Sequence, residues 1–254
     1  MRDESKMKSK KSIRILVVDD SQTNRMIITK TLSQFGYHSE IAENGRIALE
    51  KLTETSFDLV LLDLEMPEMR GEDVLTYMKK DEILSNIPVI VISSLEDINK
   101  AAQCIKQGAV DYIQKPTNPI FLEARITTSL EKKNFQDEKR NELLRAEKIQ
   151  RKLIPANVPS IKNAEFCAFY QPMEKVGGDF YDFIDLGSGN FGIFISDISG
   201  HGIPAAFITS MVKILINVYE TSKSSPKMLL KYLNQNLLDF TDFNFFSAFY
   251  GIYH

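Results

Sequence analysis

The hydrophobic positions in the first half of the chain fall into short apolar runs separated by longer amphipathic segments. The runs ILVV (residues 15–18) and LVLL (residues 59–62) are apolar at every position. Strands of this kind are typical of a parallel sheet covered by helices on both faces. The pattern from Ile13 to about Leu130 therefore predicts an α/β fold with a five-stranded doubly wound parallel sheet. Its strands are predicted in the segments IRILVVDD, YHSEIAEN, FDLVLLDLE, IPVIVISS and DYIQKP.

Residues 118–153 contain no strand-like run and are dominated by charged side chains, so they predict one long helix ended by Pro155 and Pro159. Its apolar stripes are interrupted in the middle, where Phe135 is the only apolar residue. This gap leaves two alternatives open: a solvated rigid connector, or a parallel coiled coil through which two chains form a homodimer. The stripes on either side consist of Leu122, Ile126 and Leu130, and of Leu143, Ala146, Ile149 and Leu153.

After Pro159 the chain is rich in aromatic residues with strand-like alternation, interrupted by two helical patterns. This arrangement predicts a partial α+β sandwich. Its strands are predicted in AEFCAFYQP, GGDFYDFIDL, NFGIFISDI and NFFSAFYGIY, and its helices from about Ile203 to Tyr219 and from Pro226 to Phe240. The expected organisation is a disordered basic leader (1–11), an α/β domain (12–130), a helical connector (131–154) and the partial sandwich (155–254).

Composition narrows the class of protein. With 254 residues, 43% of them apolar, the chain can build two modest cores. No apolar stretch is long enough for a membrane span or a secretory signal, so a cytoplasmic location without membrane contact is expected. The formal net charge is −3, and basic and aromatic residues do not gather on one segment, which argues against direct nucleic-acid binding. Cys104 and Cys167 are not part of a paired metal-binding motif.

Polar side chains end several of the predicted strands. Asp19 and Asp20 close the first strand, Asp63 closes the third, Ser93 closes the fourth and Lys115 follows the fifth. Carboxyl ends of parallel strands share one edge of the sheet, so these side chains are expected to converge. Because clustered carboxylates repel one another, a divalent cation with oxygen ligands, Mg²⁺ or Mn²⁺, is expected among them.

These residues, in their order along residues 12–130, resemble the response regulator receiver domain. The resemblance implies that Asp63 is the phosphoacceptor and that a sensor histidine kinase supplies the phosphoryl group. It also implies that Mg²⁺ is held by Asp19, Asp20 and Asp63, with the main-chain carbonyl of Glu65.

The same resemblance assigns roles at the ends of the last two strands. Ser93 and Lys115 would each bind a phosphoryl oxygen, and Tyr112 would turn inward when Ser93 moves. Pro116 would follow a cis peptide bond, which is common only before proline.

A second group of acids lies in two glycine-rich turns, VGGDFYDF and ISDISGHGIPAAF. Asp179 is in the first turn, with Asp182 and Asp185 just behind it, and Asp197 ends a strand directly before the second turn. A glycine turn at a helix start offers N–H groups to an anion, but the acids would repel a phosphate unless a cation lies between them. The turns therefore predict a metal site to which phosphate is drawn.

The two turns, preceded by AEKIQRKLIP, resemble the PPM family of metal-dependent protein serine/threonine phosphatases in its sporulation stage II E and sigma-factor-regulator branch. The resemblance implies that Asp179, Asp197 and the carbonyl of Ile198 bind Mn²⁺ or Mg²⁺, with Gly177, Gly178 and Gly200 allowing close backbone approach. It implies hydrolysis of a phosphoester by a metal-activated water. The implied substrate is a phosphorylated anti-sigma factor antagonist. His201 is either an acid for the leaving group or a helix-start hydrogen-bonding residue.

The family has two further aspartate ligands beyond the last predicted strand, and neither can be placed in this chain. The C-terminal part is therefore expected to be an incomplete phosphatase domain. The favoured interpretation is a response regulator in which phosphorylation of Asp63 controls a phosphatase output. The alternative is a phosphorylation-gated interaction module whose phosphatase remnant is inactive.

Overall fold

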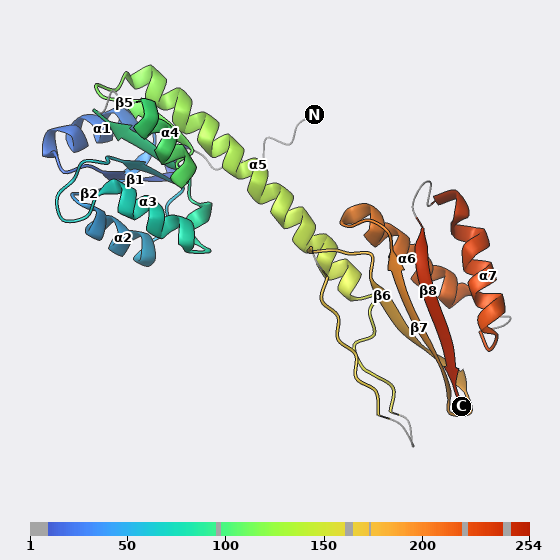
Figure 1. Ribbon diagram of the computed structural model, residues 1–254. Helices are drawn as coiled ribbons and strands as arrows, with labels where there is room; N and C mark the ends of the chain where they lie inside the picture. Colours follow the sequence, from blue (N-terminus) through green and yellow to red (C-terminus); the bar gives the residue numbers. More distant parts are fainter. Residues whose placement is uncertain (1–9, 95–97, 161–164, 173, 220–222, 241–244) are drawn as a thin grey trace. The chain divides into compact units, whose positions relative to one another are not determined.

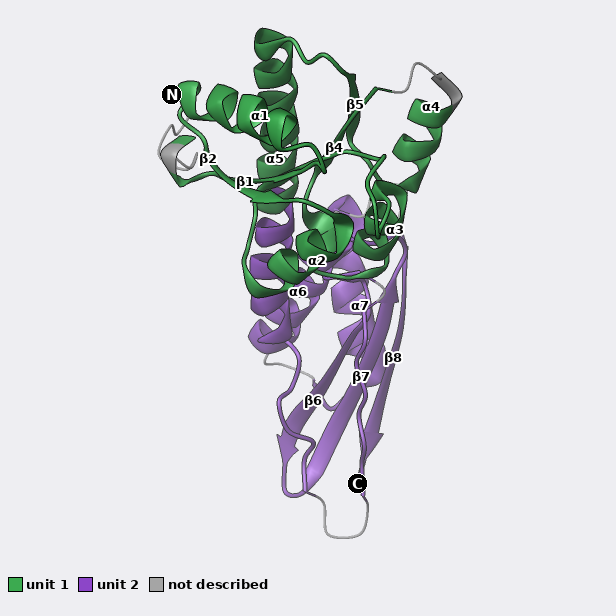
Figure 2. Ribbon diagram, turned by 90° about the vertical axis from the view of Figure 1, so that its left-hand side faces the viewer, with its two compact units in different colours: residues 1–138 green, residues 139–254 purple. Residues whose placement is uncertain are grey.

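The computed structural model describes residues 10–94, 98–160, 165–172, 174–219, 223–240 and 245–254 (Figure 1). It divides into two compact units, residues 1–138 and residues 139–254 (Figure 2). The expected basic leader lies mostly outside the described residues, and Lys10–Ser12 forms the short 3₁₀ helix η2. Among the described residues, no helix has the length and apolar character needed to cross a bilayer.

Unit 1 contains the predicted five-stranded parallel sheet, with the strand order β2-β1-β3-β4-β5. The strands are β1 (Arg14–Val18), β2 (His38–Ala42), β3 (Leu59–Leu62), β4 (Val89–Ser93) and β5 (Asp111–Gln114). The helices are α1 (Gln22–Gln34), α2 (Gly45–Glu54), α3 (Gly71–Lys80), α4 (Ile98–Gln107) and α5 (Pro119–Arg151), with a 3₁₀ helix η3 (Leu84–Asn86) after α3.

Alternate residues of the apolar strands build two separate cores, one on each face of the sheet. Leu16 and Val18 of β1 belong to the core that α2, α3 and α4 cover. Ile15 and Val17 belong to the core that α1 and α5 cover. This two-sided burial explains why the runs 15–18 and 59–62 of the central strands carry no polar residue, and why the polar side chains follow at their ends.

Unit 2 begins within α5 and contains one antiparallel sheet in the order β6-β7-β8. Its elements are β6 (Phe180–Gly187), β7 (Asn190–Ile198), α6 (Ile203–Val218), α7 (Pro226–Leu237), the 3₁₀ helix η4 (Leu238–Phe240) and β8 (Phe246–Tyr253). Helices α6 and α7 pack on one face of the sheet, around the fully buried Phe194. The prediction of a parallel domain, a long helix and an α+β region is confirmed.

One predicted strand is wrong. Residues 165–172 of the segment AEFCAFYQP have no regular secondary structure, and Ala164 lies outside the described residues. Aromatic residues favour strands, but that preference is realised only where a neighbouring strand offers its backbone groups. Here the aromatic rings pack on the sheet without backbone pairing, and Phe166 contacts Phe183 and Tyr253 edge to face.

The core of unit 2 contains a buried carboxylate of the sheet that forms an ion pair with a half-buried lysine of α6. Asp182 is 2% exposed, and the Lys213 ammonium lies 2.7 Å from its carboxylate. Burial raises the pKa of Asp182, while the hydrogen bond and charge of Lys213 oppose that rise. The side chain of Asp182 is thus committed to the core, on the sheet face that the helices cover.

Replacing Lys213 by Met is expected to destabilise unit 2 by about 3–5 kcal/mol, because it leaves the Asp182 charge buried without a partner. Urea-induced unfolding followed by circular dichroism measures this change. The double variant Asp182→Asn with Lys213→Met should recover much of the loss. Lys227→Met, which changes an exposed lysine of α7, is the matched control. Equal unfolding midpoints for Lys213→Met and Lys227→Met would contradict the role of the pair.

Candidate functional site

The carboxyl ends of the parallel strands bring three acids together in unit 1. Asp19 follows β1 and Asp63 follows β3, and these two strands are neighbours in the sheet. Carboxylate oxygens of Asp19, Asp20 and Asp63 all lie within 4.8 Å of one another. Asp19 and Asp63 are 1% and 5% exposed, so their repulsion is poorly screened by water. The predicted convergence of these residues is therefore present.

Lys115, directly after β5, offsets part of this charge. Its ammonium lies 2.8 Å from Oδ2 of Asp19 and 2.5 Å from Oδ2 of Asp63. Burial opposes the charge of Lys115, but the two carboxylates raise its pKa above the ordinary value. The ammonium therefore stays protonated between the two acids, and the cluster keeps an excess of negative charge. Three carboxylates at this spacing fit the oxygen ligation that Mg²⁺ prefers.

Two residues of α1 that were not predicted from the sequence contact the acidic corner, which is the cluster of Asp19, Asp20 and Asp63. The amide of Asn24 donates to both carboxylate oxygens of Asp19, at 3.1 and 3.2 Å. The guanidinium of Arg25 donates to the main-chain carbonyls of Asp19 and Asp20, at 2.6 and 2.9 Å. Both residues lie in the first turns of a helix that begins just after Asp19 and Asp20, and this position in the sequence could have predicted their contacts with the acids.

The backbone around Asp63 is fixed by close packing. A Cβ atom on Gly71 would lie 2.2 Å from the carbonyl oxygen of Asp63, so only glycine allows α3 to start so near. The N–H group of Asp63 donates to Val18 and that of Glu65 donates to the Asp63 carboxylate at 3.4 Å. Burial raises the pKa of Asp63, Lys115 opposes the rise, and the charge of Asp19 adds to it.

Ser93 and Tyr112 contact each other beside the cluster. Ser93 ends β4, is fully buried, and shares a hydrogen bond with the hydroxyl of Tyr112 on β5. Burial raises the pKa of Tyr112, and this hydrogen bond opposes the rise. Tyr112 also packs, half-buried, against the core that α2, α3 and α4 cover.

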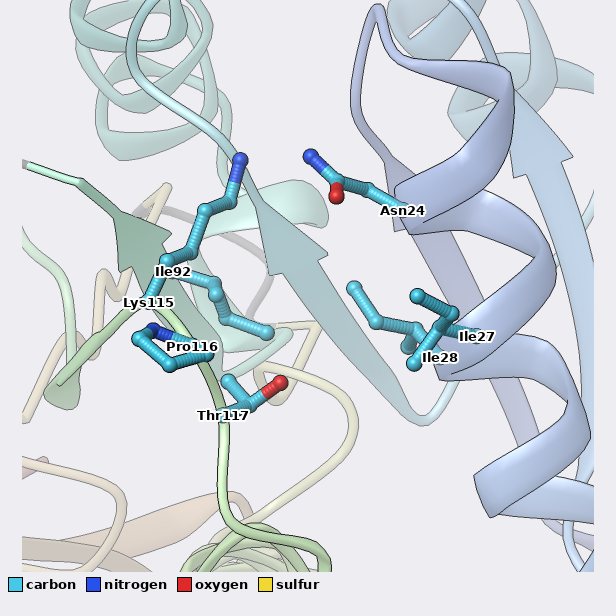
Figure 3. A pocket seen from close by; sticks show the side chains of 7 residues that line it. All are labelled: Asn24, Ile27, Ile28, Ile92, Lys115, Pro116 and Thr117. Carbon is cyan, nitrogen blue, oxygen red and sulfur yellow. The ribbon is translucent and has the colours of Figure 1, made fainter.

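A pocket of about 320 Å³ lies between α1 and the loop after β5. Figure 3 shows the ammonium of Lys115 and the amide of Asn24 at one end of it, with the isoleucines Ile27, Ile28 and Ile92 at the other. The peptide bond between Lys115 and Pro116 is cis, as expected. The pocket therefore joins the acidic corner to an apolar surface.

In unit 2 the two predicted aspartates are neighbours across β6 and β7. Phe180 pairs with Ser196, and the N–H group of Ile198 donates to the carbonyl of Gly178 at 3.4 Å, which places Asp179 opposite Asp197. Burial raises the pKa of Asp179, and the charge of Asp197 and a hydrogen bond with it raise this pKa further. Two exposed carboxylates that face each other at this spacing fit a shared divalent cation.

The turn before Asp179 is held from two sides. A Cβ on Gly178 would lie 2.5 Å from the carbonyl oxygen of Ile198, so glycine is required where the two backbones meet. The buried side chain of Gln150, near the end of α5, accepts from the N–H of Gly177 at 3.1 Å. It donates to the carbonyl of Gly177 at 2.6 Å and to the hydroxyl of Thr209 at 3.0 Å. Gln150 was not predicted from the sequence.

The other charged residues predicted in or near the two turns do not join Asp179 and Asp197. Asp182 points into the core on the opposite face of the sheet, and Asp185 accepts from the N–H of Gly187 in the hairpin turn. His201 pairs with Glu174, with Nδ1 3.1 Å from the carboxylate. This pair links the turn that precedes Asp179 to the turn that precedes α6.

Two family models match the chain. Residues 15–127 match the response regulator receiver domain, and residues 187–254 match Stage II sporulation protein E, a range that includes Asp197 but not Asp179. The fold and the acidic cluster of unit 1 are those of a signalling receiver module. The chain carries a response regulator receiver domain followed by a fragment of a SpoIIE-type PPM phosphatase domain.

The curated relatives share only part of their length with this chain. A "Probable cyclic di-GMP phosphodiesterase" of Vibrio cholerae is 37% identical over 123 residues, which are 48% of this chain and 28% of the relative. The "Probable transcriptional regulator ycf27" of Cyanidium caldarium is 38% identical over 130 residues, 51% of each chain. A CheY-like receiver domain structure from Methanospirillum hungatei is 28% identical, covers 49% of this chain and 98% of its own, and has a TM-score of 0.46.

The charge state of Asp63 predicts a pH-dependent stability. Because burial raises the folded pKa of Asp63 above its ordinary value of 3.8, the stability it contributes is present at acidic pH and is lost as pH rises through the folded pKa. In metal-free buffer, Asp63→Asn should therefore melt progressively higher than the wild type as pH rises from about 4 to 7. Mg²⁺ should reduce that difference. Glu54→Gln, which changes an exposed acid of α2, should show no such trend. A difference in melting temperature between Asp63→Asn and the wild type that stays constant across this pH range would contradict the raised pKa of Asp63.

Proposed function

We propose that unit 1 accepts a phosphoryl group on Asp63 from a sensor histidine kinase and that this modification controls a phosphatase output. The observation that carries the proposal is the Asp63 carboxylate, held 2.5 Å from the ammonium of Lys115 beside two further acids. The carboxylate is the nucleophile, and Lys115 neutralises and orients the incoming phosphoryl oxygens.

Asp19, Asp20 and Asp63 would hold Mg²⁺, with the carbonyl of Glu65. When bound, the ion supplies positive charge that lowers the repulsion between a phosphoryl group and the carboxylates. Asn24 fixes the orientation of Asp19 through both of its oxygens. The chain's own residues thereby keep the nucleophile in place and leave the ligand oxygens close together.

Ser93 and Tyr112 would form the switch. The Ser93 hydroxyl is engaged with Tyr112 here, and a phosphoryl oxygen on Asp63 would compete for that hydroxyl. Releasing Tyr112 lets its ring turn inward and changes the surface formed by β5. The phosphodonor would dock on α1, where Met26 and Ile27 are 64% and 55% exposed beside the pocket that reaches Lys115.

Unit 2 would provide the output. Asp179, Asp197 and the carbonyl of Ile198 would hold Mn²⁺ or Mg²⁺ and direct hydrolysis of a phosphoserine or phosphothreonine. A phosphorylated anti-sigma factor antagonist is the substrate that fits this family branch. A change in the connector would reach this site through Gln150, because its side chain bonds the last turns of α5 to the turn before Asp179.

The proposed organisation is a cytoplasmic protein with a receiver domain at 12–130, a connector at 131–154 and a phosphatase portion at 155–254. Phe135 of the connector is 69% exposed. Covering it with the same helix of a second chain would form the homodimer.

A second candidate function is a phosphorylation-gated interaction module. The number of candidate metal ligands in unit 2 favours it. Within the described parts of the chain, three acids close enough to share a metal occur only at Asp19, Asp20 and Asp63, which lie in unit 1. A metal held by Asp179 and Asp197 alone among carboxylates would bind weakly. In this case unit 2 recognises a partner without hydrolysing a phosphoester.

Asp63→Asn is expected to abolish phosphorylation by a small-molecule phosphodonor such as acetyl phosphate in the presence of Mg²⁺, because the nucleophile is lost. Hydroxylamine-sensitive incorporation of labelled phosphate measures the reaction. Asp73→Asn, which changes an exposed aspartate of α3, should label like the wild type. Hydroxylamine-sensitive label that persists in Asp63→Asn would exclude Asp63 as the acceptor.

The two candidate outputs differ in Mn²⁺-dependent phosphate release from a phosphoserine peptide. If unit 2 is catalytic, Asp197→Ala should lower the rate by about 100-fold or more, since the metal contributes several kcal/mol to transition-state stabilisation. Asp239→Ala, an exposed aspartate outside the two turns, is the control. Equal rates for the wild type and Asp197→Ala would leave only the interaction module.

A further inference from the structure

Residues 165–172 lie on the face of the unit 2 sheet that α6 and α7 do not cover. On β6, Phe180 and Ile184 point into the helix-covered core, so the alternate residues Tyr181 and Phe183 point to the other face. Phe166 packs edge to face on Phe183, and Tyr170 packs on Tyr181 with ring centroids 6.4 Å apart. This segment therefore covers part of the outer face with aromatic rings.

The Asp179–Asp197 pair is at one end of this same face. Asp179 precedes Tyr181 by two residues, so both side chains leave the backbone on the side where Tyr170 packs. Tyr170 therefore lies at the end of the outer face that carries Asp179, although it comes from a different segment.

The hydroxyl of Tyr170 is buried and has no hydrogen-bond partner among the residues that the structure describes. A buried hydroxyl without a partner is costly and uncommon in native proteins. A tyrosine hydroxyl carries one O–H donor, and an acceptor oxygen placed against it would satisfy that donor.

We propose that Tyr170 is a positioning residue whose hydroxyl donates a hydrogen bond to a phosphoryl oxygen held at the Asp179–Asp197 site. This inference rests on the proposed phosphatase-type metal site. A phosphate monoester fits because the two carboxylates are acceptors and cannot satisfy a phosphoryl oxygen, whereas a cation between them and a nearby O–H can. The ligand class is a phosphorylated side chain, and the tyrosine contributes to binding it in one orientation.

The test compares Tyr170→Phe with the otherwise identical full chain. Asp20→Asn and Asp63→Asn are present in every sample, so that the receiver cluster does not take up the metal. Electron paramagnetic resonance of free Mn²⁺ measures metal binding, and titration calorimetry with phosphoserine in the presence of Mn²⁺ measures oxyanion binding. Melting temperatures in EDTA report stability without ligand.

Tyr170→Phe is expected to keep the Mn²⁺ affinity, to bind phosphoserine about tenfold more weakly, and to melt in EDTA no lower than its parent, because the lost hydroxyl has no partner without ligand. Tyr253→Phe is the matched control. Tyr253 faces the same side of the sheet. It lies at the end of β8 that is far from Asp197, because Asp197 pairs with Ser247 at the other end of that strand. Tyr253→Phe should bind phosphoserine like its parent.

Equal phosphoserine affinity in Tyr170→Phe and its parent would overturn the inference while leaving the metal site intact. A lower melting temperature in EDTA would show that the hydroxyl has a structural partner, and a lost Mn²⁺ affinity would show that it supports the metal instead; either result also overturns it. Absence of Mn²⁺ binding by the parent would remove the proposed metal site, and the role of Tyr170 with it.

Discussion

The receiver unit depends on a balance between three carboxylates and one ammonium at the edge of a parallel sheet. Asp19 and Asp63 are almost fully buried, so water screens their repulsion poorly. Lys115 reaches both and offsets part of the charge. The remaining negative charge favours a divalent cation, and the cation in turn favours a phosphoryl group. Sheet topology supplies this arrangement, because β1 and β3 are neighbours and end at the same edge.

The second unit also brings two carboxylates close together, but no lysine from the part of the chain that the structure describes lies between them. Asp179 and Asp197 lie across two antiparallel strands, and no ion pair to either occurs among the described residues. The half-buried lysine of α6, Lys213, forms its ion pair with Asp182 on the other face of the sheet. Among the described residues, the repulsion between Asp179 and Asp197 is therefore not offset by an ammonium, whereas that between Asp19 and Asp63 is.

Gln150 gives the connector helix a physical link to that site. Its amide satisfies both main-chain groups of Gly177 while the same side chain bonds Thr209 of α6. A buried amide with all its partners holds the turn in one geometry, and displacing it would cost several hydrogen bonds at once. Coupling through α5 requires that this end of the helix have two arrangements that phosphorylation distinguishes.

The sequence by itself determined the parallel sheet and the convergence of Asp63 with Lys115, because apolar runs fix the strands and parallel strands end at one edge. The sequence grouped Asp182 with Asp179, and it was the structure that placed Asp182 in the helix-covered core. Only the tertiary structure decided that residues 165–172 pack as aromatic rings and not as a strand, that Gln150 bonds Gly177, and that Tyr170 packs on Tyr181. Local pattern encodes which way a side chain points from its own element. Which distant segment it meets depends on packing that no single stretch of sequence contains.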